Sequence, residues 1–105
     1  MPEHPEYNVV LSDTADSDLT DIVVYLSNFS PNIARRYYDE IMVKVHSLSS
    51  MPQRCPFVQD EVLHEKGYRW IFVRNYTIFF VICESRKIVD VRAIVYSARE
   101  YTALL

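Results

Sequence analysis

Apolar residues recur at helical intervals in the first half of the chain and alternate as in strands in the second half. A short β-prone run at residues 7–12 comes first, and two segments with an apolar residue every three or four positions follow it. The first stripe comprises Ala15, Leu19, Ile22, Val23, Leu26 and Phe29, and the second comprises Ala34, Tyr37, Tyr38, Ile41, Val45 and Leu48. Because the break between them is short, we expect the two helices to form an antiparallel hairpin.

Capping residues stand at the predicted helix ends. Ser12 or Asp13 can cap the first helix, and Ser30 followed by Pro31 is typical of the start of the second. Four carboxylates lie on the first helix at helical spacing, namely Asp13, Asp16, Asp18 and Asp21. We interpret them as a solvated helix face that benefits from the helix dipole, and not as a catalytic or metal-binding cluster.

Strand-like runs dominate the rest of the chain. Residues 52–66 show no period, which indicates a loop or an irregular edge segment. Three β-prone runs follow, separated by short polar turns, at 68–73, 76–83 and 88–96. The turn Arg74-Asn75 suits a hairpin, with Asn75 suited to a positive φ. The middle run is apolar on both faces and is therefore predicted to be the central strand.

The last run predicts two unlike faces. One face comprises Val89, Val91, Ala93 and Val95, and the other, partly wet, comprises Asp90 and Arg92. The whole order predicts an α+β domain: a strand, an antiparallel helical hairpin and a three-stranded antiparallel meander, with the helices packed on one face of the sheet. The other face then needs a cover, which is either the C-terminal tail or another protein.

Length and composition are those of one globular domain. Of 105 residues, 50% are hydrophobic and 24% are charged, so we expect a single domain over residues 1–105, with residues 1–5 as a flexible tail. No apolar run reaches the roughly 18 residues of a membrane helix, and the N-terminus has no signal-peptide features. We therefore expect a cytoplasmic protein with no membrane association. The two cysteines and three histidines have no metal-ligand spacing, so we expect no metal and no other cofactor.

Charge is distributed unevenly. Residues 1–63 carry four basic and ten acidic side chains (net −6), and residues 64–105 carry seven basic and four acidic (net +3). The second half therefore has either an anionic partner or only a mildly charged surface, and it is less basic than a dedicated nucleic-acid binder. Its arginines on strands or strand ends are Arg69, Arg92 and Arg99, with Tyr101 close by. They form either a patch for a phosphate, a carboxylate or an acidic protein surface, or ion pairs with neighbours such as Asp90.

Several short motifs occur in a fixed order over residues 6–105. They are Tyr7-x-Val9-x-Leu11-Ser12, Ala34-Arg35-Arg36-Tyr37, Leu48-Ser49-Ser50-Met51-Pro52, Gly67-Tyr68-Arg69, Asn75-Tyr76-Thr77-Ile78-Phe79-Phe80, Val91-Arg92-Ala93-Ile94 and Arg99-Glu100-Tyr101. In this order and spacing they resemble the RelE/ParE superfamily of bacterial type II toxins, also known as plasmid-stabilisation proteins. The resemblance implies a cytoplasmic toxin that a cognate antitoxin neutralises and that meets operator DNA only through the antitoxin.

The superfamily has two mechanisms. RelE-like members resemble ribosome-dependent mRNA endonucleases, and for that activity the resemblance makes Arg69, Arg99 and Tyr101 the catalytic candidates. ParE-like members lack the nuclease residues and are implicated in poisoning DNA gyrase. The acidic segment 60–65 and a sequence pI near 5.5 favour the ParE-like branch, because phosphate contacts dominate the affinity for RNA. A toxin-fold protein that has lost its activity and only binds an antitoxin is the third alternative.

Two sets of residues are candidates for partner contacts. The target-binding candidates are Arg69, Arg92, Arg99 and Tyr101, which the meander is expected to bring into one patch. The antitoxin-binding candidates are Tyr25, Phe29, Tyr37 and Tyr38, which flank apolar edges of the hairpin. A disordered antitoxin tail is expected to fold against these aromatic residues.

Overall fold

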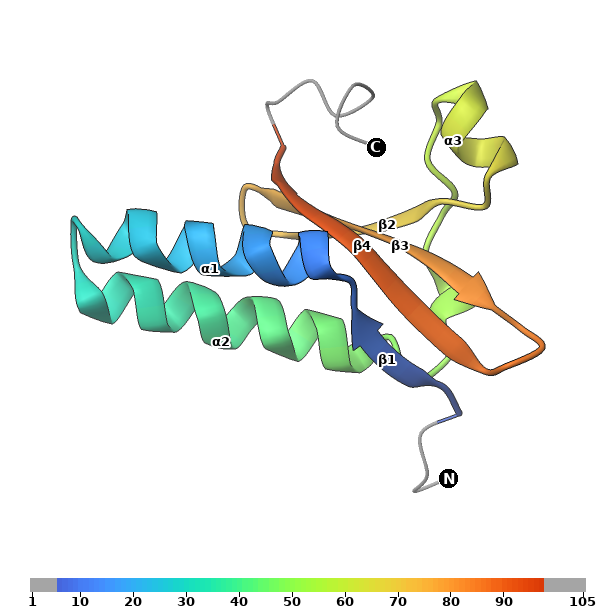
Figure 1. The fold of residues 1–105 in the computed structure, drawn as a ribbon, viewed down its shortest axis with the longest axis horizontal. Coiled ribbons are helices and arrows are strands. Elements are labelled where there is room, and N and C mark those ends of the chain that lie inside the picture. Colours follow the sequence, from blue (N-terminus) through green and yellow to red (C-terminus); the bar gives the residue numbers. More distant parts are fainter. Residues whose placement is uncertain (1–5, 98–105) are drawn as a thin grey trace.

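The computed structural model describes residues 6–97, and two long helices lie along one face of a four-stranded sheet (Figure 1). In chain order the elements are β1 Asn8–Leu11, α1 Asp13–Ser27, α2 Pro31–Ser47, the short 3₁₀ helix η1 Pro52–Arg54, α3 Glu61–Glu65, β2 Arg69–Val73, β3 Tyr76–Cys83 and β4 Ile88–Tyr96. The predicted α+β class and the order of strand, hairpin and meander are confirmed. Within the described range, no helix combines the length and the apolar character that a membrane crossing requires.

The sheet has the strand order β1-β4-β3-β2. β4 pairs antiparallel with β3 and parallel with β1, from Asn8 opposite Ile88 to Leu11 opposite Val91. β3 lies between β2 and β4, and its residues 76–80 are buried, as predicted for the central strand. The first strand of the chain therefore lies beside the last one.

Serine caps start both long helices. Ser12 Oγ accepts the N–H of Ala15 at 3.1 Å, and Ser30 Oγ accepts the N–H of Ile33 at 3.3 Å. The Ser12 hydroxyl also donates to the Arg92 carbonyl at 3.1 Å. The first turn of α1 is thus bonded to β4 as well as capped.

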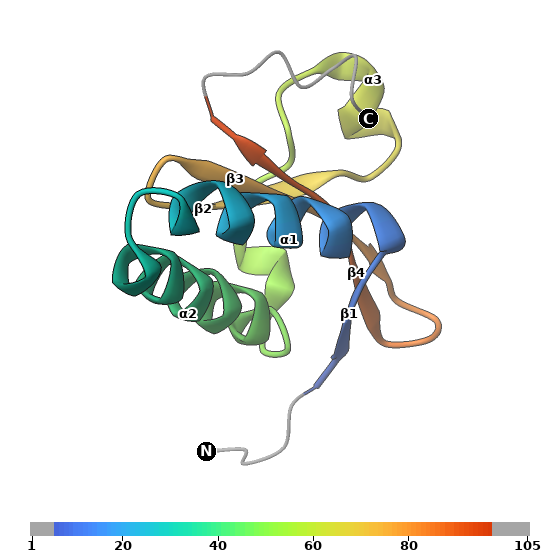
Figure 2. The ribbon, with the colours of Figure 1, turned by 60° about the vertical axis from the view of Figure 1, so that its left-hand side comes forward.

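Two apolar clusters lie on opposite faces of the sheet. The larger one, between the hairpin and the sheet, includes Leu19, Ile41, Ile78, Phe80 and Val91. The smaller one comprises the buried residues Val58, Leu63, Tyr68, Phe79, Ala93 and Val95. Leu63 belongs to α3, which lies across the sheet from α1 and α2 (Figure 2).

Part of the second face is covered by residues 56–65, so the expectation that only the C-terminal tail or another protein is available as its cover is wrong. Asp60 Oδ1 caps α3 by accepting the N–H of Leu63 at 3.0 Å. Phe57 forms a bridge with Arg69 at the outer edge of β2, as expected for an irregular edge segment. The segment 52–66 is not a loop throughout, since it contains η1 and α3. Helices of three and five residues are too short to show a period in the sequence.

β4 contains a β-bulge at Arg92. Phe80 pairs with Val91 and Phe79 pairs with Ala93, so Arg92 is the extra residue between them. The extra residue shifts the alternation by one. Val89 and Val91 therefore face the helices, whereas Ala93 and Val95 face the opposite side, and the prediction of one shared face is wrong beyond Val91.

Candidate functional site

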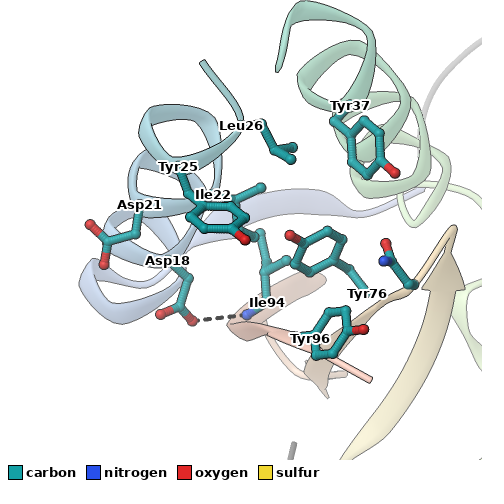
Figure 3. Close-up of a pocket in the computed structure, with 10 residues that line it drawn as sticks. Asp18, Asp21, Ile22, Tyr25, Leu26, Tyr37, Tyr76, Ile94 and Tyr96 are labelled. Atoms are coloured by element: carbon teal, nitrogen blue, oxygen red, sulfur yellow. Dashed lines mark hydrogen bonds between the residues drawn. The ribbon is translucent and has the colours of Figure 1, made fainter. Parts of the chain in front are cut away.

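An open groove lies between the helical hairpin and one end of the sheet. Its volume is about 630 Å³, and it is lined by Asp18, Asp21, Ile22, Tyr25, Leu26, Tyr37, Asn75, Tyr76, Ile94 and Tyr96. The C-terminal end of α1 and the N-terminal end of α2, where the two helices connect, extend past the sheet. The strands do not cover the hairpin there (Figure 1). These ten residues define what we name the tyrosine groove (Figure 3).

One wall of the tyrosine groove follows from a local sequence pattern, and the other follows from strand pairing. Ile22, Tyr25 and Leu26 lie three or four residues apart and therefore share one side of α1. Tyr76 lies directly across from Tyr96, at the end of the β3–β4 pair that is away from the turn joining the two strands. Since the bulge at Arg92 precedes this pair, the bulge determines which side chains of β4 reach the groove.

The tyrosine rings pack edge to face. The centroid of Tyr76 lies 6.1 Å from that of Tyr37 and 5.9 Å from that of Tyr96, with interplanar angles of 89° and 72°. Burial raises the pKa of Tyr76, and the neighbouring tyrosines Tyr37, Tyr25 and Tyr96 raise it further. Its hydroxyl therefore stays protonated near neutral pH. The hydroxyl ends of Tyr25 and Tyr76 point toward one another (Figure 3).

Two aspartates form one end of the tyrosine groove. Asp18 Oδ2 accepts the backbone N–H of Ile94 at 2.9 Å, and Asp21 lies beyond it, exposed at the rim (Figure 3). The interpretation of both residues as a merely solvated helix face is therefore wrong for Asp18. Within residues 6–97, no three His, Cys, Asp or Glu side chains gather as a metal site.

An ion pair lies beside Tyr37, on the side of the tyrosine groove away from the two aspartates. Arg74 Nε and Nη2 each donate to Glu40 at 2.8 Å, and the guanidinium lies 4.9 Å from the ring centroid of Tyr37. The bond from Arg74 lowers the pKa of Glu40, and the same bond raises the pKa of Arg74. Arg74, and not Asn75, has the positive φ of the β2–β3 turn, at 52°.

The four antitoxin-binding candidates do not share one surface. Tyr25 and Tyr37 line the tyrosine groove, and the ring of Phe29 packs edge to face on Tyr25 at 5.2 Å. Tyr38 instead lines a second groove of about 280 Å³, together with Leu11, Asp16, Leu19, Thr20, Val23, Val24 and Met42. Two of the four candidates thus line the tyrosine groove, and Phe29 adjoins it through Tyr25.

Arg69 makes three contacts with η1 and the segment that follows it. Its Nη1 donates to the carbonyls of Gln53 and Cys55, at 3.1 and 2.7 Å, and its Cζ lies 3.9 Å from the ring centroid of Phe57. The imidazole of His64 stacks on the same ring at 4.6 Å. Arg69 therefore joins β2 to the edge segment, and it forms no ion pair with a carboxylate among residues 6–97.

Arg92 lies on the bulge and is exposed. Its Nη1 lies 3.0 Å from Asp90 Oδ2, as the ion-pair alternative predicts. The bonds to Asp90 and then to Tyr68 raise the pKa of Arg92. Much of this guanidinium remains open to solvent.

The structure does not bring Arg69 and Arg92 into one patch. Arg69 is paired with Phe80, which packs under the helices, whereas the Asp90 partner of Arg92 is paired with Val81, which packs on the opposite face. Directly paired residues share a face, so the two arginines point to opposite sides of the sheet. Arg99 and Tyr101 lie outside the described residues.

Sequence patterns identified only part of the tyrosine groove. The sequence identifies Tyr76 and Tyr96 only as strand residues, because neither the pairing of β3 with β4 nor the bulge is visible in it. Asp18 and Asp21 are one turn apart on the side of α1 that also carries Ile22 and Tyr25. The position of Asp18 beside the apolar stripe of α1 is the sequence signal that indicates its contact with β4 at the edge of the core.

Comparison with known proteins assigns this chain to a class of bacterial toxins. The family model described as "ParE toxin of type II toxin-antitoxin system, parDE" matches residues 9–101. The chain therefore belongs to the ParE toxin family, within the RelE/ParE superfamily. No curated protein sequence matches it.

Two solved structures share the fold. One, described as the chromosomal ParDE toxin–antitoxin system from P. aeruginosa, has a TM-score of 0.70 and 18% identity, over 89% of this chain and 98% of that chain. The other, the toxin–antitoxin complex RelBE2 from Mycobacterium tuberculosis, has a TM-score of 0.63 and 18% identity, over 87% and 98%. Both similarities concern the backbone fold.

Proposed function

We propose that this protein inhibits bacterial growth by acting on DNA gyrase in the cytoplasm, and that a cognate antitoxin neutralises it by covering the tyrosine groove. The observation that carries the proposal is the ParE family match over nearly the whole described chain. The P. aeruginosa relative is a toxin–antitoxin system by its description, which supports an antitoxin partner here.

Surface chemistry supports gyrase over mRNA as the target. Asp60, Glu61 and Glu65 outnumber the one basic residue of the α3 segment, Lys66. Arg69, three residues further on, already donates to two backbone carbonyls. A surface of this kind offers few free contacts for RNA phosphates. The proposed contacts with the target are Arg92, which presents an exposed guanidinium, Arg99 and Tyr101. Arg69 is a separate candidate, because it points to the opposite side of the sheet from Arg92.

The groove supports an antitoxin of the type that folds on binding. Tyr25 is 58% exposed and Phe29 is 71% exposed, and the two rings pack edge to face on each other. Exposed apolar surface of this kind marks an interaction site. A disordered tail that folds over the groove would bury both rings.

Induced expression without an antitoxin tests the target. The expected result is filamentation and a DNA-damage response, with inhibition of purified gyrase by the purified protein. Primer extension on cellular mRNA serves as the discriminating measurement. Codon-specific cuts soon after induction would instead establish the ribosome-dependent nuclease, and normal growth with active gyrase would establish an inactive antitoxin-binding protein.

A further inference from the structure

The tyrosine groove combines aromatic walls with a negatively charged end. α1 contains four aspartates and no lysine or arginine, and two of those aspartates, Asp18 and Asp21, line the groove. Figure 3 shows both carboxylates at one end, on the same helix as the ring of Tyr25. The faces of tyrosine rings attract cations, and so do carboxylates. Both features therefore favour a cationic side chain in the groove.

Asp21 is the carboxylate that is placed to meet an occupant. Asp18 already accepts the Ile94 N–H, and Asp21 is exposed one turn further along α1. No ion pair between described residues involves Asp21. An apolar occupant that covered Asp21 would remove water from the carboxylate without replacing its hydrogen bonds, which is unfavourable.

Charge also argues against a second copy of this chain as the occupant. Each copy has a net charge of −3. In a twofold contact through the groove, the acidic side of one α1 would lie against the same acidic side of the other. An acidic peptide would meet the same repulsion.

We infer that the antitoxin segment that occupies the tyrosine groove presents an arginine or lysine side chain to Asp21. The alkyl stem of that side chain lies along Tyr25, and its apolar neighbours contact Ile22 and Leu26. This inference rests on the proposed function for the identity of the partner. The charge selection itself is a property of the groove and can be measured without any toxicity assay.

A displayed library of random linear peptides, selected on the immobilised full-length protein, tests the inference. Enriched peptides are expected to carry an arginine or lysine between apolar residues and to shift the NMR resonances of the tyrosine groove. Asp21→Lys should weaken their binding by at least about tenfold, as removal of a close charge pair does. Replacing the peptide arginine by citrulline, which keeps the shape and removes the charge, should weaken binding similarly.

Asp39→Lys is the matched control, because Asp39 is an exposed aspartate in the middle of α2, outside the tyrosine groove, and the substitution makes the same change in net charge. It should leave peptide binding unchanged. Equal losses in the two variants would reduce the effect to overall charge and overturn the inference. Peptides that bind the groove without a basic residue, no enrichment of groove-binding peptides, or self-association through the groove would overturn it too. None of these results bears on whether the protein inhibits gyrase.

Discussion

The Asp18 carboxylate and the Ile94 amide, 76 residues apart in sequence, form a hydrogen bond of 2.9 Å between α1 and β4. The bond lies beyond the last pair of the parallel strands, Leu11 opposite Val91. Past that pair, the outer edge of β4 has no strand partner within the described residues. A side chain thus provides the acceptor that a longer β1 would have provided.

Asp18→Ala should destabilise the protein by about 1–3 kcal/mol, because the partly buried N–H of Ile94 loses its acceptor. Asp18→Asn should lose less, since the amide oxygen can still accept. The free energies of unfolding come from urea denaturation. Asp21→Ala, an exposed change on the same helix, is the control and should stay within about 0.5 kcal/mol of wild type. Equal stability of the two alanine variants would contradict this role of Asp18.

Arg69→Ala should lower the melting temperature more than Arg92→Ala. Arg69 loses charged hydrogen bonds to two carbonyls and its stacking on Phe57, which corresponds to about 1.5–3 kcal/mol. Arg92 loses one exposed ion pair with Asp90, which is worth at most about 1 kcal/mol.

Toxicity, measured with the same variants and with Arg99→Ala, then separates structural from target-binding roles. A toxic effect that disappears in Arg92→Ala while the melting temperature is unchanged would identify a target contact. Loss only in Arg69→Ala, in proportion to its unfolding, would identify a structural arginine.

The helices of this fold were predictable because their signals are local. Ser12 and Ser30 cap helices whose apolar residues repeat every three or four positions, and both caps form as the sequence indicates. The faces of β4 were not predictable beyond Val91. An unpaired extra residue such as Arg92 has no sequence signature in an alternating run, because its presence is defined only by the pairing with Phe79 and Phe80.

Deletion of Arg92 should be milder than deletion of Asp90. Without Arg92, Val91 still pairs with Phe80 and Ala93 with Phe79, so each apolar side chain keeps its face. Without Asp90, the residues before it shift by one, and Val89 turns away from the helix-side cluster. Thermal melting and amide exchange of β4 measure the difference. A larger loss for the Arg92 deletion would show that the bulge itself carries the stability.

Stability should fall in acid, in part through two surface carboxyl groups. The bond from Arg74 lowers the pKa of Glu40, and the bonds from Tyr7 and Gln53 lower that of Glu84, both from an ordinary value of 4.5. The folded state therefore binds these protons less tightly than the unfolded state. The contribution is complete above pH 4.5 and is lost as the pH falls through the lowered pKa values.

Urea midpoints across the acid range check this for the wild type and the double variant Glu40→Gln with Glu84→Gln. The wild type should be more stable near neutral pH, and the difference should vanish at low pH, where all the carboxyl groups are protonated. A difference that persists in acid would assign the stability to the neutral hydrogen bonds of these side chains instead.

The candidate site was less predictable than the fold, because it is assembled from distant elements. Tyr25 and Tyr37 were found as aromatic residues on the exposed hairpin, but Tyr76 and Tyr96 reach the tyrosine groove through strand pairing. Tyr38 has the same residue type as Tyr25 and also lies on the hairpin, but it lines the second groove. Only the three-dimensional arrangement shows which of the tyrosines within residues 6–97 meet.

The parallel pairing of β1 with β4 also has a consequence for how the protein is made. Ser12 bonds to Arg92, 80 residues later, so the first strand cannot take its place until nearly all of the described chain has been synthesised. Contacts of such long sequence separation slow folding. The hairpin can form early on the ribosome, with its apolar side awaiting β3 and β4, and a nascent chain in this state offers a binding partner a surface before the completed sheet covers it.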